Sequence, residues 1–86
     1  MSESAFRIIL NVDDNEALRY AKTRVLKAAG FTVSEAGTAQ EGLELMRRVQ
    51  PHLALLDVKL PDMNVIELAR IIKSDPIFER TLVLQT

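Results

Sequence analysis

The sequence contains no cysteine, so disulfide bonds and thiolate metal sites are excluded. This absence fits a protein of a reducing compartment. An excess of one charge is missing too, because 11 Lys and Arg residues stand against 12 Asp and Glu residues and the formal net charge is −1. Balanced charge gives no reason to expect direct binding to nucleic acid, and no acidic tail indicates disorder.

Long hydrophobic runs are absent as well. No stretch approaches the ~18 apolar residues of a membrane-spanning helix, and the N-terminal MSESAFRIIL lacks the apolar core of a signal peptide. We therefore expect a cytoplasmic protein that does not contact membranes. The 86 residues, of which 48% are hydrophobic, predict one small domain over residues 1–86 with a core of modest size.

Apolar runs alternate with helical patterns along the chain, which is typical of βαβ units in a parallel sheet. Four runs predict strands, at residues 7–12, 31–37, 53–57 and 81–86. The second run alternates apolar and polar residues and is expected at a sheet edge, whereas the third is the most apolar and is expected to be central. Right-handed crossovers then predict a doubly wound βαβαβαβ sheet with helices on both faces.

The three predicted helices have recognisable ends and inner faces. The first carries an apolar stripe that is expected to face the core, made of Leu18, Ala21, Val25 and Ala28. The second begins at a capping box in which Thr38 and Glu41 have the T-x-x-E spacing. Asn64 is expected to cap the third, with either Val65 or Ile66 on its core-facing side.

Three carboxylates follow the ends of two predicted strands. Asp13 and Asp14 come directly after the first strand, and Asp57 ends the third. If the strand order reverses beside the first strand, these strands are neighbours, and their carboxyl ends open onto the crevice where ligands bind in open α/β sheets. Carboxylates held together repel one another unless a cation lies among them, and Mg²⁺ prefers oxygen ligands. The pattern therefore predicts a Mg²⁺ site whose Asp can attack phosphorus and become an aspartyl phosphate.

Simpler roles are available to each of these residues. Asp13 and Asp14 could stabilise the N-terminus of the first helix, and Asp57 could be a turn residue at the end of a strand. The apolar LALL before Asp57 and the Leu-Pro-Asp after its loop favour the site.

With these motifs, the chain resembles the receiver domain of two-component response regulators. The segments ILNVDDNE, LALLDVKLPDMN and TLVLQT keep the family's order and spacing. The resemblance implies a flavodoxin-like sheet of order 2-1-3-4 and a signalling domain rather than an enzyme. It implies a Mg²⁺ site with Asp14 as a direct ligand, Asp13 acting through water, and Asp57 and the backbone carbonyl of Lys59 as further ligands. Asp57 would accept a phosphoryl group from a partner sensor histidine kinase or phosphotransfer protein, and the Thr86 hydroxyl would sense it.

Two departures from the family pattern stand out. A fifth strand and helix are expected in the family, and a Lys on that strand pairs with the phosphoryl group; no Lys in this sequence occupies a matching position. Val65 stands where the family usually has Gly, so strain in the loop before the third helix is expected. The fourth strand, at residues 81–86, would then be an exposed apolar edge that drives self-association and so completes the sheet.

These departures leave a second hypothesis open, namely a phosphorylation-impaired receiver-like module that acts by dimerisation or protein binding. A haloacid-dehalogenase-type phosphatase also uses an Asp nucleophile with Mg²⁺, but the Asp-x-Asp it needs after the first strand is not found in VDDN. A dinucleotide-binding enzyme is disfavoured because no glycine-rich turn follows a predicted strand.

Overall fold

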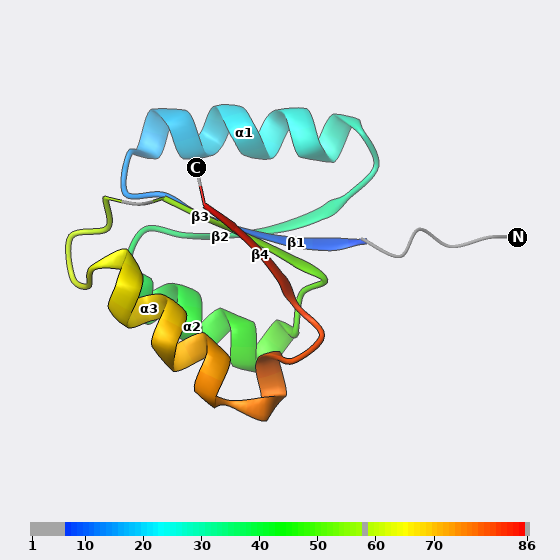
Figure 1. The fold of residues 1–86 in the computed structure, drawn as a ribbon. Coiled ribbons are helices and arrows are strands. Elements are labelled where there is room, and N and C mark those ends of the chain that lie inside the picture. Colours follow the sequence, from blue (N-terminus) through cyan, green and yellow to red (C-terminus); the bar gives the residue numbers. More distant parts are fainter. Residues whose placement is uncertain (1–6, 58, 86) are drawn as a thin grey trace, which may run out of the picture.

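The computed structural model describes residues 7–57 and 59–85 as a parallel sheet with helices on both faces (Figure 1). Its strands lie in the order β2-β1-β3-β4, namely β2 (Thr32–Ala36), β1 (Ile8–Val12), β3 (Leu53–Leu56) and β4 (Leu82–Gln85). Helix α1 (Glu16–Ala28) covers one face, and α2 (Ala39–Val49) and α3 (Val65–Ser74) cover the other. A short 3-10 helix, η1 (Pro76–Phe78), precedes β4. The predicted flavodoxin-like, doubly wound arrangement is confirmed.

The main core lies between the sheet and helices α2 and α3. Its buried strand residues include Leu10, Val12, Ala54 and Leu56, and its buried helical residues include Leu43, Met46, Leu68, Ile72 and Phe78. Helix α2 approaches β1 closely at Gly42, where a Cβ atom would lie 3.0 Å from Cγ2 of Val12. Because interiors are close-packed, this contact fixes α2 against the strand that leads into the acidic pair.

The inner face of α1 differs from the prediction. Leu18 and Val25 of the predicted apolar stripe are 56% and 69% exposed, whereas Thr23 is the buried residue of this helix. Thr23 faces the fully buried Asn11 of β1, whose Nδ2 donates to its Oγ1 at 3.2 Å and to the carbonyl oxygen of Arg19 at 3.0 Å. Polar contacts with the strand therefore set the rotation of α1, because a buried amide N–H group without an acceptor is costly.

The helix caps follow the sequence closely. The side chains of Thr38 and Asn64 accept from the N–H groups of Glu41 and Glu67 at 3.1 and 2.8 Å, as the capping patterns predict. The carboxylate of Glu41 accepts from the N–H of Gly37, one residue before the cap, instead of from Thr38 itself. Local sequence thus determines where both helices begin.

The strain expected at Val65 is not found. Val65 is the first residue of α3, and among the described residues other than glycine only Gln50 has a positive φ. The first turn of a helix accepts a β-branched residue with little cost, because its backbone is in the ordinary right-handed region. Of the two candidates for the core-facing position, Val65 is half-buried, whereas Ile66 is 69% exposed.

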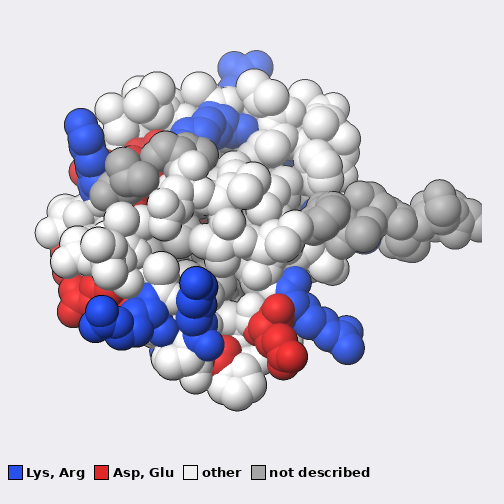
Figure 2. Space-filling model, viewed as in Figure 1, with Lys and Arg blue, Asp and Glu red and all other residues white. Residues whose placement is uncertain are grey.

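Strand β4 forms the edge of the described sheet, and its Leu82 and Leu84 are 54% and 53% exposed. Figure 2 shows acidic and basic side chains interspersed around a largely uncharged surface on this side of the molecule. An apolar strand edge is a template for pairing with another chain, so self-association at β4 stays a prediction.

No helix within residues 7–57 and 59–85 combines the length and apolarity that crossing a membrane requires.

The loop between β3 and α3 is tied to α2 by Asp62. Its Oδ1 accepts from the N–H of Ala39 at 2.8 Å, and its Oδ2 accepts from the N–H of Gln40 at 2.9 Å. These N–H groups have no partner within the helix, and the positive end of the helix dipole favours a carboxylate. The N–H of Ala39, followed by that of Gln40, lowers the pKa of Asp62. Asp62 therefore anchors the loop that follows Asp57 to the N-terminus of α2.

Replacing Asp62 with Ala is expected to lower the free energy of unfolding by about 1 kcal/mol at neutral pH, because two helical N–H groups lose their acceptor. The pKa of Asp62 is lower in the folded chain, so the ionised carboxylate stabilises the fold above the unfolded-state pKa. That contribution is lost as the pH falls through the folded-state pKa. Urea denaturation should therefore show a difference between wild type and variant that shrinks as the pH falls below about 4.

The matched control is Glu44→Ala, which removes an exposed carboxylate from the same helix α2. It is expected to leave stability within about 0.5 kcal/mol of wild type. An Asp62→Ala protein as stable as wild type at neutral pH would show that the two contacts to α2 contribute nothing.

Candidate functional site

The ends of β1 and β3 place the three predicted carboxylates side by side. The two strands are paired in parallel with Val12 opposite Leu56. The N–H of Asp57 donates to the carbonyl oxygen of Val12 at 2.9 Å, and that of Asp13 donates to the carbonyl oxygen of Ala36 on β2 at 3.0 Å. Backbone hydrogen bonds therefore fix both aspartates just beyond the sheet.

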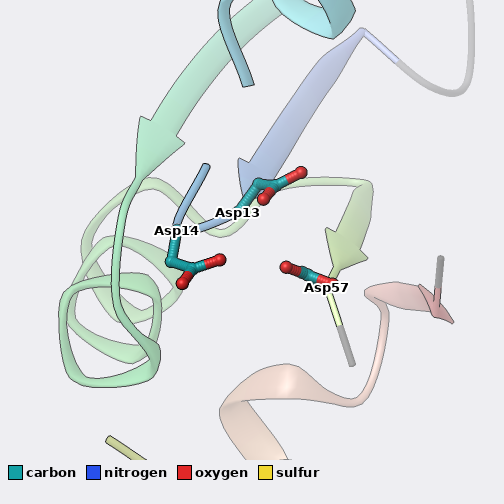
Figure 3. A group of neighbouring side chains, drawn as sticks. All are labelled: Asp13, Asp14 and Asp57. Carbon is teal, nitrogen blue, oxygen red and sulfur yellow. The ribbon is translucent and has the colours of Figure 1, made fainter. Parts of the chain in front are cut away.

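The carboxylates of Asp13, Asp14 and Asp57 converge, with one oxygen of each lying within 4.8 Å of the others. Figure 3 shows the side chains of Asp14 and Asp57 pointing toward one another from the two strand ends. Asp13 is buried at 3% exposure, Asp57 is half-buried, and Asp14 is exposed. The predicted acidic cluster thus exists, and its three carboxylates range from buried to exposed.

Asp13 is the carboxylate of the three that has contacts on both of its oxygens. Its Oδ1 accepts from the N–H of Asn15 at 2.9 Å, and its Oδ2 lies 3.0 Å from Nζ of Lys22. Burial acts most strongly on its pKa and raises it, but the N–H of Asn15 and the ammonium of Lys22 together outweigh burial and hold the pKa of Asp13 below its ordinary value. Asp13 is therefore an ionised carboxylate held in place from two sides.

Asp57 is oriented by the loop that follows it. Its Oδ1 accepts from the N–H of Lys59 at 3.2 Å, while the side chain of Lys59 is exposed. The backbone of Lys59 therefore lies beside the cluster, as the predicted ligand role of its carbonyl requires. Thr86, the predicted sensor of the phosphoryl group, lies outside the described residues.

The donor set suits a hard divalent cation. All three side chains offer carboxylate oxygens, which Mg²⁺ prefers, and the cluster contains neither sulfur nor imidazole ligands. The exposed Asp14 has neither a hydrogen bond nor an ion pair among the described residues, so its oxygens can take a cation without losing a partner. The oxygens of Asp13 already accept a hydrogen bond from Asn15 and pair with Lys22. This arrangement fits a contact between Asp13 and the cation through a water molecule.

Two residues of α1 contact Asp13 although the sequence patterns did not predict these contacts. Arg19 donates from Nη1 to the carbonyl oxygen of Asp13 at 2.8 Å and from Nε to Glu35 of β2 at 2.9 Å. Lys22 reaches the carboxylate of Asp13 from the next turn of the helix. The sequence signal for these residues is that Arg19 and Lys22 lie three positions apart and therefore on the same face of α1. That spacing identifies them only when it is known that this face of the helix packs against the sheet.

Comparison with known proteins agrees with this geometry. Residues 9–84 match the family described as "Response regulator receiver domain". The DNA-binding response regulator MtrA of Mycolicibacterium smegmatis is 39% identical over 67 residues, which make up 78% of this chain and 29% of that protein. The chain thus spans less than a third of the length of this relative.

Solved structures give the same result. A CheY-like receiver domain protein of Methanospirillum hungatei is similar with a TM-score of 0.82 and 34% identity, covering 93% of this chain and 62% of that chain. The chemotaxis response regulator CheY4 of Vibrio cholerae shares the fold, with a TM-score of 0.87 and 24% identity over 93% of this chain and 67% of that chain. Since the family match runs from residue 9 to residue 84 and contains the whole acidic cluster, the chain belongs to the response regulator receiver domain family.

Proposed function

We propose that this chain is the phosphoacceptor of a cytoplasmic phosphorelay, in which Asp57 takes a phosphoryl group from a partner histidine kinase or phosphotransfer protein. The observation that carries the proposal is the convergence of Asp13, Asp14 and Asp57 within 4.8 Å at the carboxyl ends of adjacent strands. Its agreement with the family match over residues 9–84 supports this function over a plain binding module.

The proposed transfer is a substitution at phosphorus. An oxygen of Asp57 attacks the phosphorus of a phosphohistidine on the partner, and an O–P bond forms while the N–P bond breaks. The electron pair of the broken bond leaves with the imidazole, which takes up a proton. The N–H of Lys59 holds one oxygen of Asp57 at 3.2 Å, so the carboxylate is already oriented before the donor arrives.

Mg²⁺ is the proposed metal. Asp14, Asp57 and the backbone carbonyl of Lys59 would hold it directly, and Asp13 would hold it through water. When bound, Mg²⁺ would neutralise the carboxylates and the phosphoryl oxygens, which otherwise repel one another. The hydroxyl of Thr86 is the proposed donor to a phosphoryl oxygen, and the added charge would then bias the surface used for partner recognition.

Acetyl phosphate with Mg²⁺ is expected to add one phosphoryl group to the chain, with acetate as the leaving group, and intact-mass spectrometry measures the product. Asp57→Asn should abolish the addition, because an amide oxygen is a far weaker nucleophile than a carboxylate. Glu44→Gln, an exposed carboxylate of α2, is the control and should be phosphorylated like wild type. Addition that survives Asp57→Asn would remove Asp57 from its role, and no addition to wild type would favour the binding-module hypothesis.

Asp14→Asn is expected to have opposite effects on stability with and without Mg²⁺. Without the metal it removes one of three mutually repelling carboxylates and should raise the free energy of unfolding by about 0.5 kcal/mol. With millimolar Mg²⁺ the wild type should become the more stable protein, because ligand binding stabilises the folded state and the variant binds the metal more weakly. Thermal denaturation with and without Mg²⁺ measures the reversal, and an unchanged order of the two proteins would contradict a metal site at Asp14.

A further inference from the structure

One arginine of helix α1 connects the ends of strands β1 and β2. The guanidinium of Arg19 donates from Nη1 to the carbonyl oxygen of Asp13 at 2.8 Å and from Nε to Oε1 of Glu35 at 2.9 Å. Its side chain is 19% exposed although it carries a charge. The guanidinium also lies beside Gly37, where a Cβ atom would come within 3.1 Å of Nη1. Arg19 therefore fits closely between the two strand ends.

The backbone of Arg19 is held as firmly as its side chain. Its N–H donates to the carbonyl oxygen of Asn15 at 2.9 Å, and its own carbonyl oxygen accepts from Nδ2 of the fully buried Asn11 at 3.0 Å. A guanidinium is planar, and its N–H groups point in fixed directions. A fixed backbone and two acceptors together therefore define where Nη1 lies.

The carbonyl group that Arg19 holds belongs to the peptide bond between Asp13 and Asp14. This peptide unit is planar, so rotating it changes ψ of Asp13 and φ of Asp14 and redirects the Cα–Cβ bond of Asp14. The side chain of Asp14 has neither a hydrogen bond nor an ion pair among residues 7–57 and 59–85. Its direction toward Asp57 (Figure 3) therefore depends on the backbone that precedes it.

We propose that Arg19 is a positioning residue for Mg²⁺ binding, because it fixes the Asp13–Asp14 peptide and thereby presents the carboxylate of Asp14 to the ion. This inference rests on the proposed function, since it needs Mg²⁺ at the acidic cluster. Arg19 itself does not contact the ion in this role. Mg²⁺ requires near-octahedral geometry, so a displaced peptide lowers its affinity even though all three carboxylates are still present.

A different role for Arg19 would be that of an ion-pair partner that only ties α1 to Glu35. The two roles predict opposite changes in Mg²⁺ affinity. A guanidinium near three carboxylates repels a divalent cation, so removing a mere ion-pair partner would strengthen Mg²⁺ binding. Removing a positioning residue would weaken Mg²⁺ binding, and the loss would depend on the carboxylate of Asp14.

The test is a double-mutant cycle of Arg19→Gln and Asp14→Asn, in which the affinity for Mg²⁺ alone is measured by NMR titration of the backbone amide signals. Arg24→Gln is the matched control, because it removes an exposed arginine from the same helix. Circular dichroism and a urea midpoint establish that each variant is folded. Arg19→Met, which retains the aliphatic stem, replaces Arg19→Gln in the cycle should Gln disturb the helix.

Arg19→Gln is expected to bind Mg²⁺ about tenfold more weakly than wild type, and Arg24→Gln should match wild type. The double variant should bind no more weakly than Asp14→Asn alone, because Arg19 acts through that carboxylate. Wild-type or tighter Mg²⁺ binding by Arg19→Gln, or additive losses in the double variant, would overturn the inference and leave the proposed function intact. A wild type that neither binds Mg²⁺ nor takes a phosphoryl group from acetyl phosphate would overturn both.

Discussion

The parallel pairing of β1 with β3 is the constraint on which the candidate site depends. With Val12 opposite Leu56, the residues that leave the two strands are Asp13 and Asp57, and both carboxylates reach the same acidic cluster. A slip of one residue would turn every side chain of β3 to the opposite face. Ala54 and Leu56 prevent such a slip, because they are buried in the core beneath α2 and α3. Core packing therefore enforces the geometry of a charged site that itself contributes little to the core.

The second constraint is the polar interface between α1 and β1. Asn11 has no exposed surface, and its amide nitrogen donates to Arg19 and Thr23 of α1. Hydrogen bonds are directional, so such an interface specifies the rotation of a helix more narrowly than an apolar stripe does. The rotation that gives the side-chain nitrogen of Asn11 its two acceptors is also the one that directs Arg19 and Lys22 toward Asp13. The two hydrogen bonds of one buried amide nitrogen thus determine which cations reach the site.

The parts of this structure that could be predicted from sequence are those encoded locally. Strand patterns, the capping side chains and the acidic residues after two strand ends each involve neighbours in the chain, and the strand order then brings Asp13, Asp14 and Asp57 together. The remainder depends on long-range contacts. Asp62 reaches Ala39 across 23 residues, and nothing in its own segment specifies that acceptor role. The inner face of α1 was predicted wrongly because its apolar residues formed the clearer stripe, whereas buried polar partners on β1 decided the outcome.

Two rigid attachments surround the half-buried Asp57. Its backbone is bonded to β1 through Val12, and the loop that follows it is anchored to α2 through Asp62. A charge added at this point therefore cannot be relieved by moving the strand ends without breaking the sheet ladder. Side chains with free torsions and the loop between the two anchors are the elements that can respond. If Asp57 accepts a phosphoryl group as proposed, the response would therefore begin in the side chains around Asp57 and in residues 59–62, which lie before the anchor at Asp62, and not in the packed core.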